Sequence, residues 1–380
     1  MILREMDIWR RRPSYIVGAV VPLLMSTLFF VTFFGDGIPS ELPIGVVDLD
    51  HSSLTRNFVR QLDATQLGAV RCYDTWQEAR DAMQKGLVTS VCVLPEGLQR
   101  DVMTNRRPAI TFYVNGLYFV GGALAYKDLL TMINLTSGGV QRELLRAKGV
   151  DERSIRGLLR PVDLDTHQIG NPTTDYGVYL LAGLLPGVLA MSVVLVLIYS
   201  IGTELKYGTS RHLLRTAGGS MHVALAGKVL LYFVFFSLLG WALVLVLYRW
   251  LGYPFAGSLG WMFLAISLMV LASEAIAVTI VGLIPVCRFA LSVGALYSVL
   301  AFSMSGFSLP VETLMAWLQG FSSMFPLRHY YQFFVMEGIY AGGFSGLYPE
   351  MMHLIVFLAV PFLVIRRLEK AFIRLDYPKN

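Results

Sequence analysis

The side chains that most often carry chemistry are scattered along this sequence and form no catalytic or metal-binding motif. His167, His329 and His353 show neither the H-E-x-x-H spacing nor the Cys/His pairs of zinc sites, so we expect no metal site. The G-x-S-x-G sequence of serine hydrolases is also missing. Gly227-Lys228 lacks the upstream glycine and the following hydroxyl residue of a phosphate-binding loop. Any ATP hydrolysis must therefore come from another chain.

Glu274 is the one acidic residue deep inside a long apolar segment. A carboxylate there is costly, so it normally faces protein, water or a partner charge. One interpretation places Glu274 on a substrate path. The alternative is a neutral Glu that hydrogen-bonds a neighbouring helix through Ser, Thr or a backbone carbonyl.

Two cysteines fall on predicted strands of a segment that we expect outside the cytoplasm, where thiols can oxidise. A disulfide between Cys72 and Cys92 is one interpretation, and two free thiols are the other, because their separation is unknown. Nearby, Asp48-Leu49-Asp50-His51 could bind a ligand. We favour an Asx-rich turn that leads into a helix capped by Ser52 or Ser53.

Long apolar segments predict an α-helical polytopic membrane protein. Of the 380 residues, 55% are hydrophobic and 15% are charged, with a mean hydropathy of +0.58. Soluble domains usually have about 25% charged residues, and a helix needs about 20 apolar residues to cross a bilayer. We predict six transmembrane helices, at Ser14–Phe34, Gly177–Ile201, Val229–Tyr248, Trp250–Ser273, Phe289–Val311 and Met351–Ile365, the last extended from near Tyr348.

Residues 1–13 predict an interfacial helix, because Trp9 stands among arginines and apolar residues. The apolar segment 14–34 is longer than the core of a signal peptide and no small-x-small cleavage site follows it, so we expect it to be retained.

Lysine and arginine are distributed unevenly over the predicted loops. The side opposite the termini carries Arg328, with Arg249 at its border. By the positive-inside rule, both termini are cytoplasmic. The net charge of +5 thus reflects the orientation in the membrane and favours contact with anionic lipid. We expect no nucleic-acid partner. The cations on the terminal side are Arg4, Arg10, Arg11, Arg12, Lys206, Arg211, Arg215, Lys228, Arg288, Arg366, Arg367, Lys370, Arg374 and Lys379.

Residues 35–175 predict an extracytoplasmic α/β domain inserted between the first two transmembrane helices. Short β-rich runs alternate with amphipathic stretches there, which is typical of a largely parallel sheet. A long helix, Tyr118–Lys148, follows the last strand. The predicted strands are Ile44–Leu49, Ala69–Tyr73, Thr89–Leu94 and Ile110–Val114, and the helices between them are Ser53–Leu62, Thr75–Lys85 and Pro95–Asn105.

The cytoplasmic connection at residues 201–216 contains Leu213 and Leu214, which a short polar loop would not need. On a helix they share a face with neighbours three to four residues away and predict an amphipathic element that docks into a partner. The alternative is a helix on the lipid surface without a partner.

This connection resembles the loop after the second transmembrane helix of ABC-2 type transporter permeases, through its pattern of Glu204, then Gly208-Thr209, then Leu213-Leu214. A second resemblance lies at residues 307–348 and just before them. Lys206 and Ala217 depart from the family pattern, where Glu and Pro are common. The residues of the second resemblance are Gly306, Pro310, Glu312, Trp317, Pro326 and Arg328.

The resemblance covers essentially the whole chain and points to the drug-export-like branch with a large extracytoplasmic domain. It implies an elbow helix at residues 1–13, a coupling helix at 201–216 that contacts a cytoplasmic ABC ATPase, and a re-entrant extracytoplasmic hairpin at 307–348. No cofactor would bind this chain, and ATP with magnesium would bind the ATPase. The implied protein is a permease subunit in the bacterial inner membrane, without enzymatic activity of its own.

The resemblance further implies a homodimer or a heterodimer with a similar permease, a periplasmic membrane-fusion adaptor as a further partner, and export of a hydrophobic or amphipathic substrate. A rival interpretation is a non-transporting six-span surface or secretion component, similar to phage-infection proteins. A membrane-embedded lipid enzyme is a weaker rival, because Glu337, Glu350 and His353 are sparse for catalysis.

Overall fold

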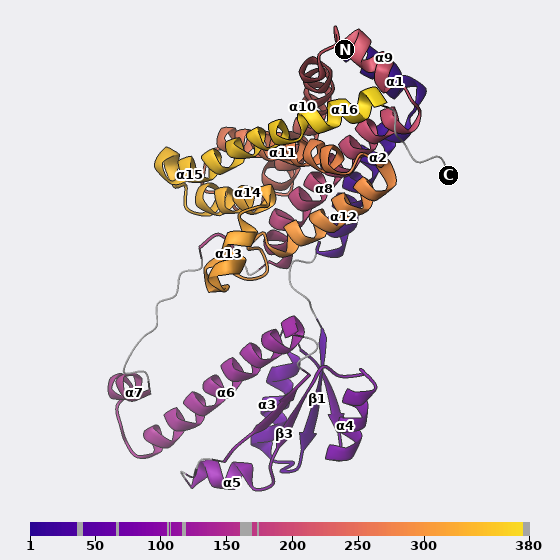
Figure 1. Cartoon of the computed structure of the whole chain (residues 1–380). Coiled ribbons are helices and arrows are strands. Elements are labelled where there is room, and N and C mark those ends of the chain that lie inside the picture. The colour runs from indigo at the N-terminus through magenta and orange to yellow at the C-terminus, as the bar shows by residue number, and fades with distance from the viewer. Residues whose placement is uncertain are drawn as a thin grey trace. The chain divides into compact units, whose positions relative to one another are not determined.

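The computed structural model describes most of the chain, and its described residues form two compact units. The first comprises Met1–Gly37 and Gln168–Asn380, and the second comprises Ile38–His167. Figure 1 shows the elements of both units, coloured by residue number. His167 and Lys379, and the predicted element ends at Asn105 and Tyr118, lie outside the described residues. The described ranges are 1–35, 41–65, 68–104, 106, 108–115, 119–159, 169–172 and 175–374.

The first unit is helical throughout its described elements. Its first half contains α1 (Ile2–Arg11), α2 (Ser14–Phe33), α8 (Tyr176–Lys206), α9 (Ser210–Thr216), α10 (Met221–Leu245) with the π-helical turn η1 (Val246–Trp250), and α11 (Leu259–Leu283). Its second half contains α12 (Cys287–Ser303), η2 (Val311–Thr313), α13 (Ala316–Ser322), α14 (Pro326–Phe334), η3 (Val335–Ile339), α15 (Gly343–Val356), η4 (Phe357–Leu363) and α16 (Ile365–Arg374).

Five helices among the described residues are long and apolar enough to cross a membrane. The fourth predicted span is displaced, because the chain forms a loop after η1 and α11 begins only at Leu259. The fifth predicted span corresponds to α12, whose 17 residues give about 25 Å of helix against a hydrocarbon core of about 30 Å. The count of six spans therefore stays a prediction. The five long helices are Ser14–Phe33, Tyr176–Lys206, Met221–Trp250, Leu259–Leu283 and Gly343–Leu363.

Helices α8 and α11 form the centre of this unit. In their most apolar windows 72% and 78% of the residues are buried, compared with 11% in α2 and 17% in the α15 segment. Close approach to α8 depends on glycine: a Cβ on Gly183 would lie 2.4 Å from the ring of Phe307, and one on Gly187 would lie 2.9 Å from Phe302. These aromatic residues follow or end α12, so small residues bring its end against α8.

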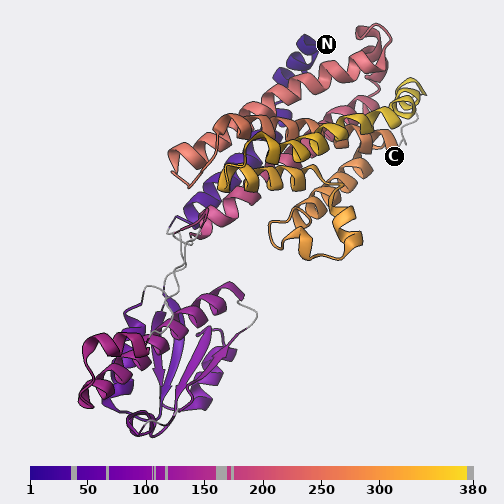
Figure 2. The ribbon, with the colours of Figure 1, turned by 90° about the vertical axis from the view of Figure 1, so that its left-hand side faces the viewer.

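The second unit is an α/β fold with a four-stranded sheet in the order β2-β1-β3-β4. Its strands are β1 (Leu42–Asp48), β2 (Gly68–Tyr73), β3 (Ser90–Leu94) and β4 (Thr111–Val114), and its helices are α3 (Ser53–Asp63), α4 (Trp76–Gln84), α5 (Leu98–Met103), α6 (Phe119–Ala147) and α7 (Glu152–Leu159). Strands β1, β2 and β3 are parallel, and β4 runs antiparallel at the edge. Figure 2 shows helices on both faces of the sheet.

Alternation along the strands determines the two faces of this sheet. Ile44 and Val46 of β1 pack with Phe58 and Leu62 of α3 in one hydrophobic cluster, which α5 and α6 complete. Val47, the next residue, faces the other side and packs with α4. The strand positions were predicted within two residues, since β-branched runs mark buried parallel strands.

The turn after β1 has the Asx geometry that the sequence favoured. Asp48 Oδ1 accepts hydrogen bonds from the backbone N–H groups of Asp50 (3.1 Å) and His51 (3.0 Å). Ser52 caps α3, and Asp50 accepts from the N–H groups of Gly97 (2.8 Å) and Gln99 (3.0 Å) at the start of α5. These acidic residues therefore satisfy backbone donors at helix starts.

The disulfide interpretation is wrong for Cys72 and Cys92, which are both free thiols. Each is in register with Val46, Cys72 on β2 and Cys92 on β3, so β1 lies between them. Two strand spacings separate their Cα atoms by about 9 to 10 Å, beyond the span of a disulfide.

We predict that these two thiols differ in reactivity. Cys72 is exposed, although burial of its thiol and the neighbouring Asp48 and Asp63 raise its pKa. Burial raises the pKa of Cys92 to about 12, so at pH 8 almost no thiolate forms there. Treatment of the folded chain with N-ethylmaleimide, followed by peptide mass spectrometry, should label Cys72 and leave Cys92 unlabelled until denaturant is added. Equal labelling of both thiols in the folded chain would contradict the fold of this sheet.

Candidate functional site

A cluster of four charged side chains joins the N-terminal helix to the helical bundle. Arg4 on α1 forms a bidentate pair with Glu204 of α8, with both N···O distances at 2.9 Å. Lys228 of α10 lies 2.8 Å from Glu5 and 3.3 Å from Glu204. Arg4 also contacts Glu5 at 2.9 Å. The two cations and two carboxylates neutralise each other, and we call these four residues the buried charge cluster.

The buried charge cluster is almost completely removed from solvent. The side chains of Glu5, Lys228 and Glu204 are 0%, 2% and 4% exposed, and Arg4 is 16% exposed. Ser200 accepts a further hydrogen bond from the Lys228 ammonium at 2.9 Å. For Arg4, burial by itself would lower the pKa, but the pairs with Glu204 and Glu5 outweigh it and raise the pKa, so the guanidinium stays charged.

Aromatic side chains surround this cluster and hold α1 in place. Trp9 donates its indole N–H to the hydroxyl of Tyr232 at 2.9 Å, and the two rings meet edge to face. Tyr15, at the start of α2, shares a hydrogen bond with Thr203 at 2.9 Å. The guanidinium of Arg12 lies 4.8 Å from the ring centre of Tyr207. The N-terminal helix is thus packed on α8 and α10 through several independent contacts.

The turn from α8 into α9 is bonded directly to the buried charge cluster. The Thr209 hydroxyl donates to the Glu204 carboxylate, and the Thr209 N–H donates to the Glu204 carbonyl at 3.0 Å. Gly208 has φ +69, a left-handed conformation that glycine adopts without steric cost after a helix end. The spacing of Glu204, Gly208 and Thr209 is therefore the spacing of one helix end and its turn.

Helix α9 is fixed to the bundle along its inner face. Leu213 is 1% exposed and Leu214 is 8% exposed, and both belong to the main hydrophobic core. Ser210 donates to the carbonyl of Phe372 at 2.9 Å, and Arg211 donates to the carbonyl of Ile373 at 3.0 Å, both on α16. Figure 1 shows α9, α1 and α16 at the same end of the unit.

These positions correct two sequence-based expectations about the connection at 201–216. Leu213 and Leu214 do not project toward a partner, because the core of this chain buries them. Glu204 belongs to α8 and is turned inward, away from the surface of the connection. The residues that α9 and its turn expose are Tyr207, Gly208, Thr209, Arg211, His212, Arg215 and Thr216, and with Lys206 they form a surface that carries positive charge.

Glu274 lies inside the bundle, apart from the charge cluster. It belongs to α11 and is 0% exposed, and neither carboxylate oxygen has a hydrogen-bond partner in the structure. The expected hydrogen bond to a neighbouring helix is therefore not seen among the described residues. An unpaired polar group in such surroundings costs about 1–3 kcal/mol or more, which makes Glu274 an unusual buried residue.

Side chains of the hairpin residues named from the sequence make hydrogen bonds within the hairpin. The Gln332 side-chain amide donates to the Glu312 carboxylate at 3.2 Å, and the Arg328 guanidinium donates to the backbone carbonyl of Gln319 at 3.2 Å. Pro326 occupies the first turn of α14. Gly306 has φ +87 and Pro310 precedes η2, so both shape the turn after α12.

Sequence analysis missed Arg4, Glu5 and Lys228 as members of a site. Arg4 and Lys228 were counted only as cations of the cytoplasmic side. A usable signal was the position of Lys228 between the apolar residues 223–227 and the predicted span that starts at Val229, because a lysine with apolar residues on both sides normally has a partner. Its partner Glu5 lies 223 residues away in sequence, so no local spacing connects them.

The long apolar helices define an integral membrane protein. The buried charge cluster holds its N-terminal helix α1 against α8, α10 and the turn between α8 and α9. A sequence model of the family described as ABC-2 family transporter protein matches residues 13–366, and the chain belongs to this family. It is thus a membrane component of an ABC transporter, a class that lacks its own ATPase site and works with an ABC ATPase subunit. None of the curated proteins compared with the chain matches it.

We predict that the buried charge cluster stabilises the fold strongly. The substitution Lys228→Met leaves two buried carboxylates with one cation, and it should lower the free energy of unfolding in detergent by about 3–5 kcal/mol. The matched control is Arg11→Met, which removes an exposed pair with Asp7 (78% and 56% exposed). The control should change stability by less than about 1 kcal/mol. Equal losses in the two variants would show that the cluster has no special role.

Proposed function

We propose that the chain is the permease subunit of an ABC exporter and that the exposed face of α9 is the surface on which its ATPase partner acts. The observation that carries this proposal is the anchoring of α9. A short helix that is fixed to the core on one side and basic on the other suits the transmission of force from a partner. Because the chain belongs to the ABC-2 family, the partner is an ABC ATPase subunit.

Helix α9 and the turn before it are connected to four other helices, either directly or through Glu204. Thr209 connects it to Glu204 of α8, and Glu204 is paired with Arg4 of α1 and Lys228 of α10. Ser210 and Arg211 connect α9 to α16. A displacement of α9 would therefore move the ends of α1, α8, α10 and α16 together, because breaking the buried pairs costs more than moving them as a body.

In this mechanism the ATPase changes conformation with its nucleotide state and biases the bundle between inward-open and outward-open arrangements. The substrate is hydrophobic or amphipathic, and Glu274 is the polar group of its path. Two such subunits, identical or related, would form the path, since symmetric pairs are the commonest assemblies. The α/β unit would lie outside the cytoplasm and receive substrate or a periplasmic adaptor.

The location proposed for the chain is the bacterial inner membrane with both termini in the cytoplasm. Arginine and lysine support this orientation: α1, α9 and α16 carry most of them at one end of the helical unit. The membrane location itself follows from the apolar helices and the family.

We predict that reversing charge on the outer face of α9 uncouples the ATPase. Arg215 is exposed, so Arg215→Glu should leave folding intact but reduce ATPase co-purification and permease-stimulated ATP hydrolysis at least about tenfold, since like charges now meet across the contact. The measurement uses the ATPase that co-purifies with the tagged chain, reconstituted in liposomes.

Arg249→Glu is the control, because Arg249 is exposed on η1, beyond the far end of α10 from α9. It should leave hydrolysis unchanged. If Arg215→Glu behaves like this control, or if no ATPase co-purifies with the wild-type chain, the proposed coupling surface is wrong.

For Glu274 we predict a loss of transport without a loss of folding. Glu274→Gln keeps the shape of the side chain, so the yield of monodisperse protein should match the wild type. Compounds that stimulate hydrolysis by the wild-type complex should stimulate the variant at least about tenfold less. Ser237→Ala, which also removes a buried polar group without a hydrogen-bond partner, is the control and should transport normally. Normal stimulation of the Gln variant, or poor yield alone, would contradict a place on the path.

A further inference from the structure

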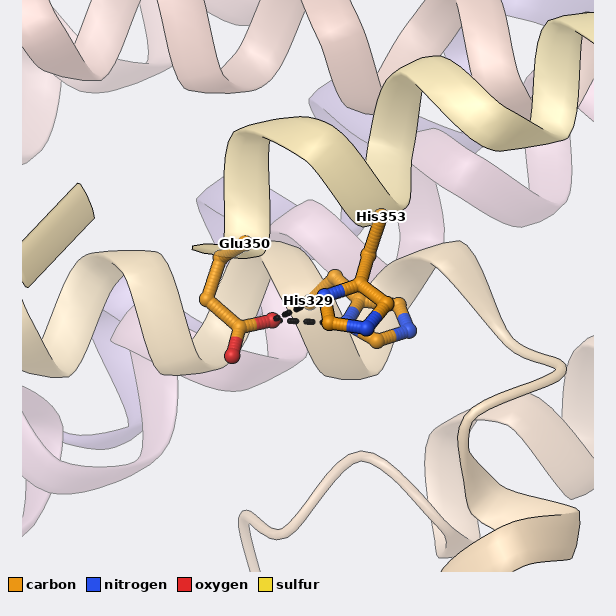
Figure 3. Close-up of side chains that lie close together, drawn as sticks. All are labelled: His329, Glu350 and His353. Atoms are coloured by element: carbon orange, nitrogen blue, oxygen red, sulfur yellow. Dashed lines mark hydrogen bonds and ion pairs between the residues drawn. The ribbon is translucent and has the colours of Figure 1, made fainter. Parts of the chain in front are cut away.

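Two histidines that lie 24 residues apart in sequence meet beside a glutamate in the helical unit. His329 belongs to α14, and Glu350 and His353 belong to α15 (Figure 3). One ligand atom from each side chain lies within 4.8 Å of the other two. Within the part of the chain that the structure describes, this is the one such group of three potential metal ligands. Neither the proposed function nor the family assignment uses it.

The hydrogen bonds of His329 determine the role of each ring nitrogen. Its Nε2 lies 3.0 Å from the carbonyl oxygen of Ser323, and since a carbonyl only accepts, Nε2 carries a proton. Its Nδ1 lies 2.6 Å from a carboxylate oxygen of Glu350, so one proton is shared between these two atoms. Histidines that bind metals usually donate their second N–H to a carbonyl or carboxylate in this way. His329 is only 3% exposed, which fixes its ring.

His353 shows the same arrangement with the nitrogens exchanged. Its Nδ1 lies 2.7 Å from the carbonyl oxygen of Pro349 and must donate to it, which leaves Nε2 with a free lone pair. The ring stacks on that of His329, with centres 4.6 Å apart and planes at 9°. Because His353 is 55% exposed, its ring can tilt out of the stack to direct Nε2 at a common point.

We propose that His329 Nδ1, the Glu350 carboxylate and His353 Nε2 bind one divalent transition-metal ion, for which Zn²⁺ is the best fit. The metal takes the place of the proton that His329 and Glu350 share. Two imidazoles and one carboxylate suit zinc, copper or nickel, whereas Mg²⁺ and Ca²⁺ prefer oxygen ligands throughout. Water reaches the fourth position from the side on which His353 is exposed.

The rearrangement needed at Glu350 is small, and the larger movement is the tilt of the His353 ring, whose Nδ1 lies 4.0 Å from Glu350. Ligand atoms at about 2.0–2.1 Å from a tetrahedral zinc ion lie roughly 3.3 Å apart, so the Glu350 oxygen must retreat from His329 by about 0.7 Å. Glu350 is 22% exposed and can make this movement. The bound ion would join α14 to α15 and thereby fix these two helices to each other.

The test measures Zn²⁺ binding by the full chain, purified in detergent without a polyhistidine tag and stripped with EDTA. Isothermal titration should show one saturable site per chain, and Co²⁺ bound in its place should give the visible absorption of a tetrahedral complex. His353→Ala should weaken Zn²⁺ binding about 10- to 100-fold or more. Its elution in gel filtration should match the wild type, because the removed ring is largely exposed.

Two further variants make the result decisive. His222→Ala removes an exposed histidine of α10 that is not a member of the group, and it should bind Zn²⁺ like the wild type. Glu350→Gln keeps the size of the side chain but loses the charged ligand, so it should bind weakly even if it folds normally. The proposal is overturned if the wild type shows no saturable site at micromolar Zn²⁺, or if His353→Ala and Glu350→Gln bind as tightly as His222→Ala.

Discussion

The pairing of Glu204 with Arg4 and Lys228 is the interaction on which the arrangement of the helical unit depends. A carboxylate at the end of a membrane helix is stable in a buried position only when cations neutralise it and donors saturate its oxygens. Arg4 supplies two donors, Lys228 supplies one and Thr209 supplies another. Because these donors come from different segments, satisfying one carboxylate fixes the positions of α1, α10 and the turn before α9.

This constraint also fixes α9, whose exposed face is the proposed coupling surface. The helix is short, and seven residues would be marginal as an isolated helix in water. Its stability comes from Leu213 and Leu214 in the core and from the bonds of Ser210 and Arg211 to α16. What remains exposed is polar and basic. In the proposed mechanism, a partner that presses on this surface would move α9 together with the helices bonded to it.

The strands and helices of the α/β unit, in contrast, follow from short-range sequence patterns. Alternation along β1 and the capping residues of α3 and α4 are readable directly, and the predicted and observed elements agree closely. The order of the strands was not readable, because the parallel crossovers place β1 between β2 and β3. That order separates Cys72 from Cys92, although both were correctly placed on strands.

The sequence by itself determined the class of the protein, four of the five long apolar helices with the other one displaced, the strands of the α/β unit and the position of the turn before α9. Hydropathy, the periodicity of apolar residues and the residue types of turns involve only a few neighbouring residues. These features can therefore be recognised in the sequence without the tertiary structure. Only the tertiary structure decided that Leu213 and Leu214 face inward, that Glu204 meets Arg4, and that His329 meets Glu350 and His353. These contacts depend on which helices pack together. Distant segments pack so that buried charges are paired and the core is filled, and short-range sequence patterns do not show which segments will meet.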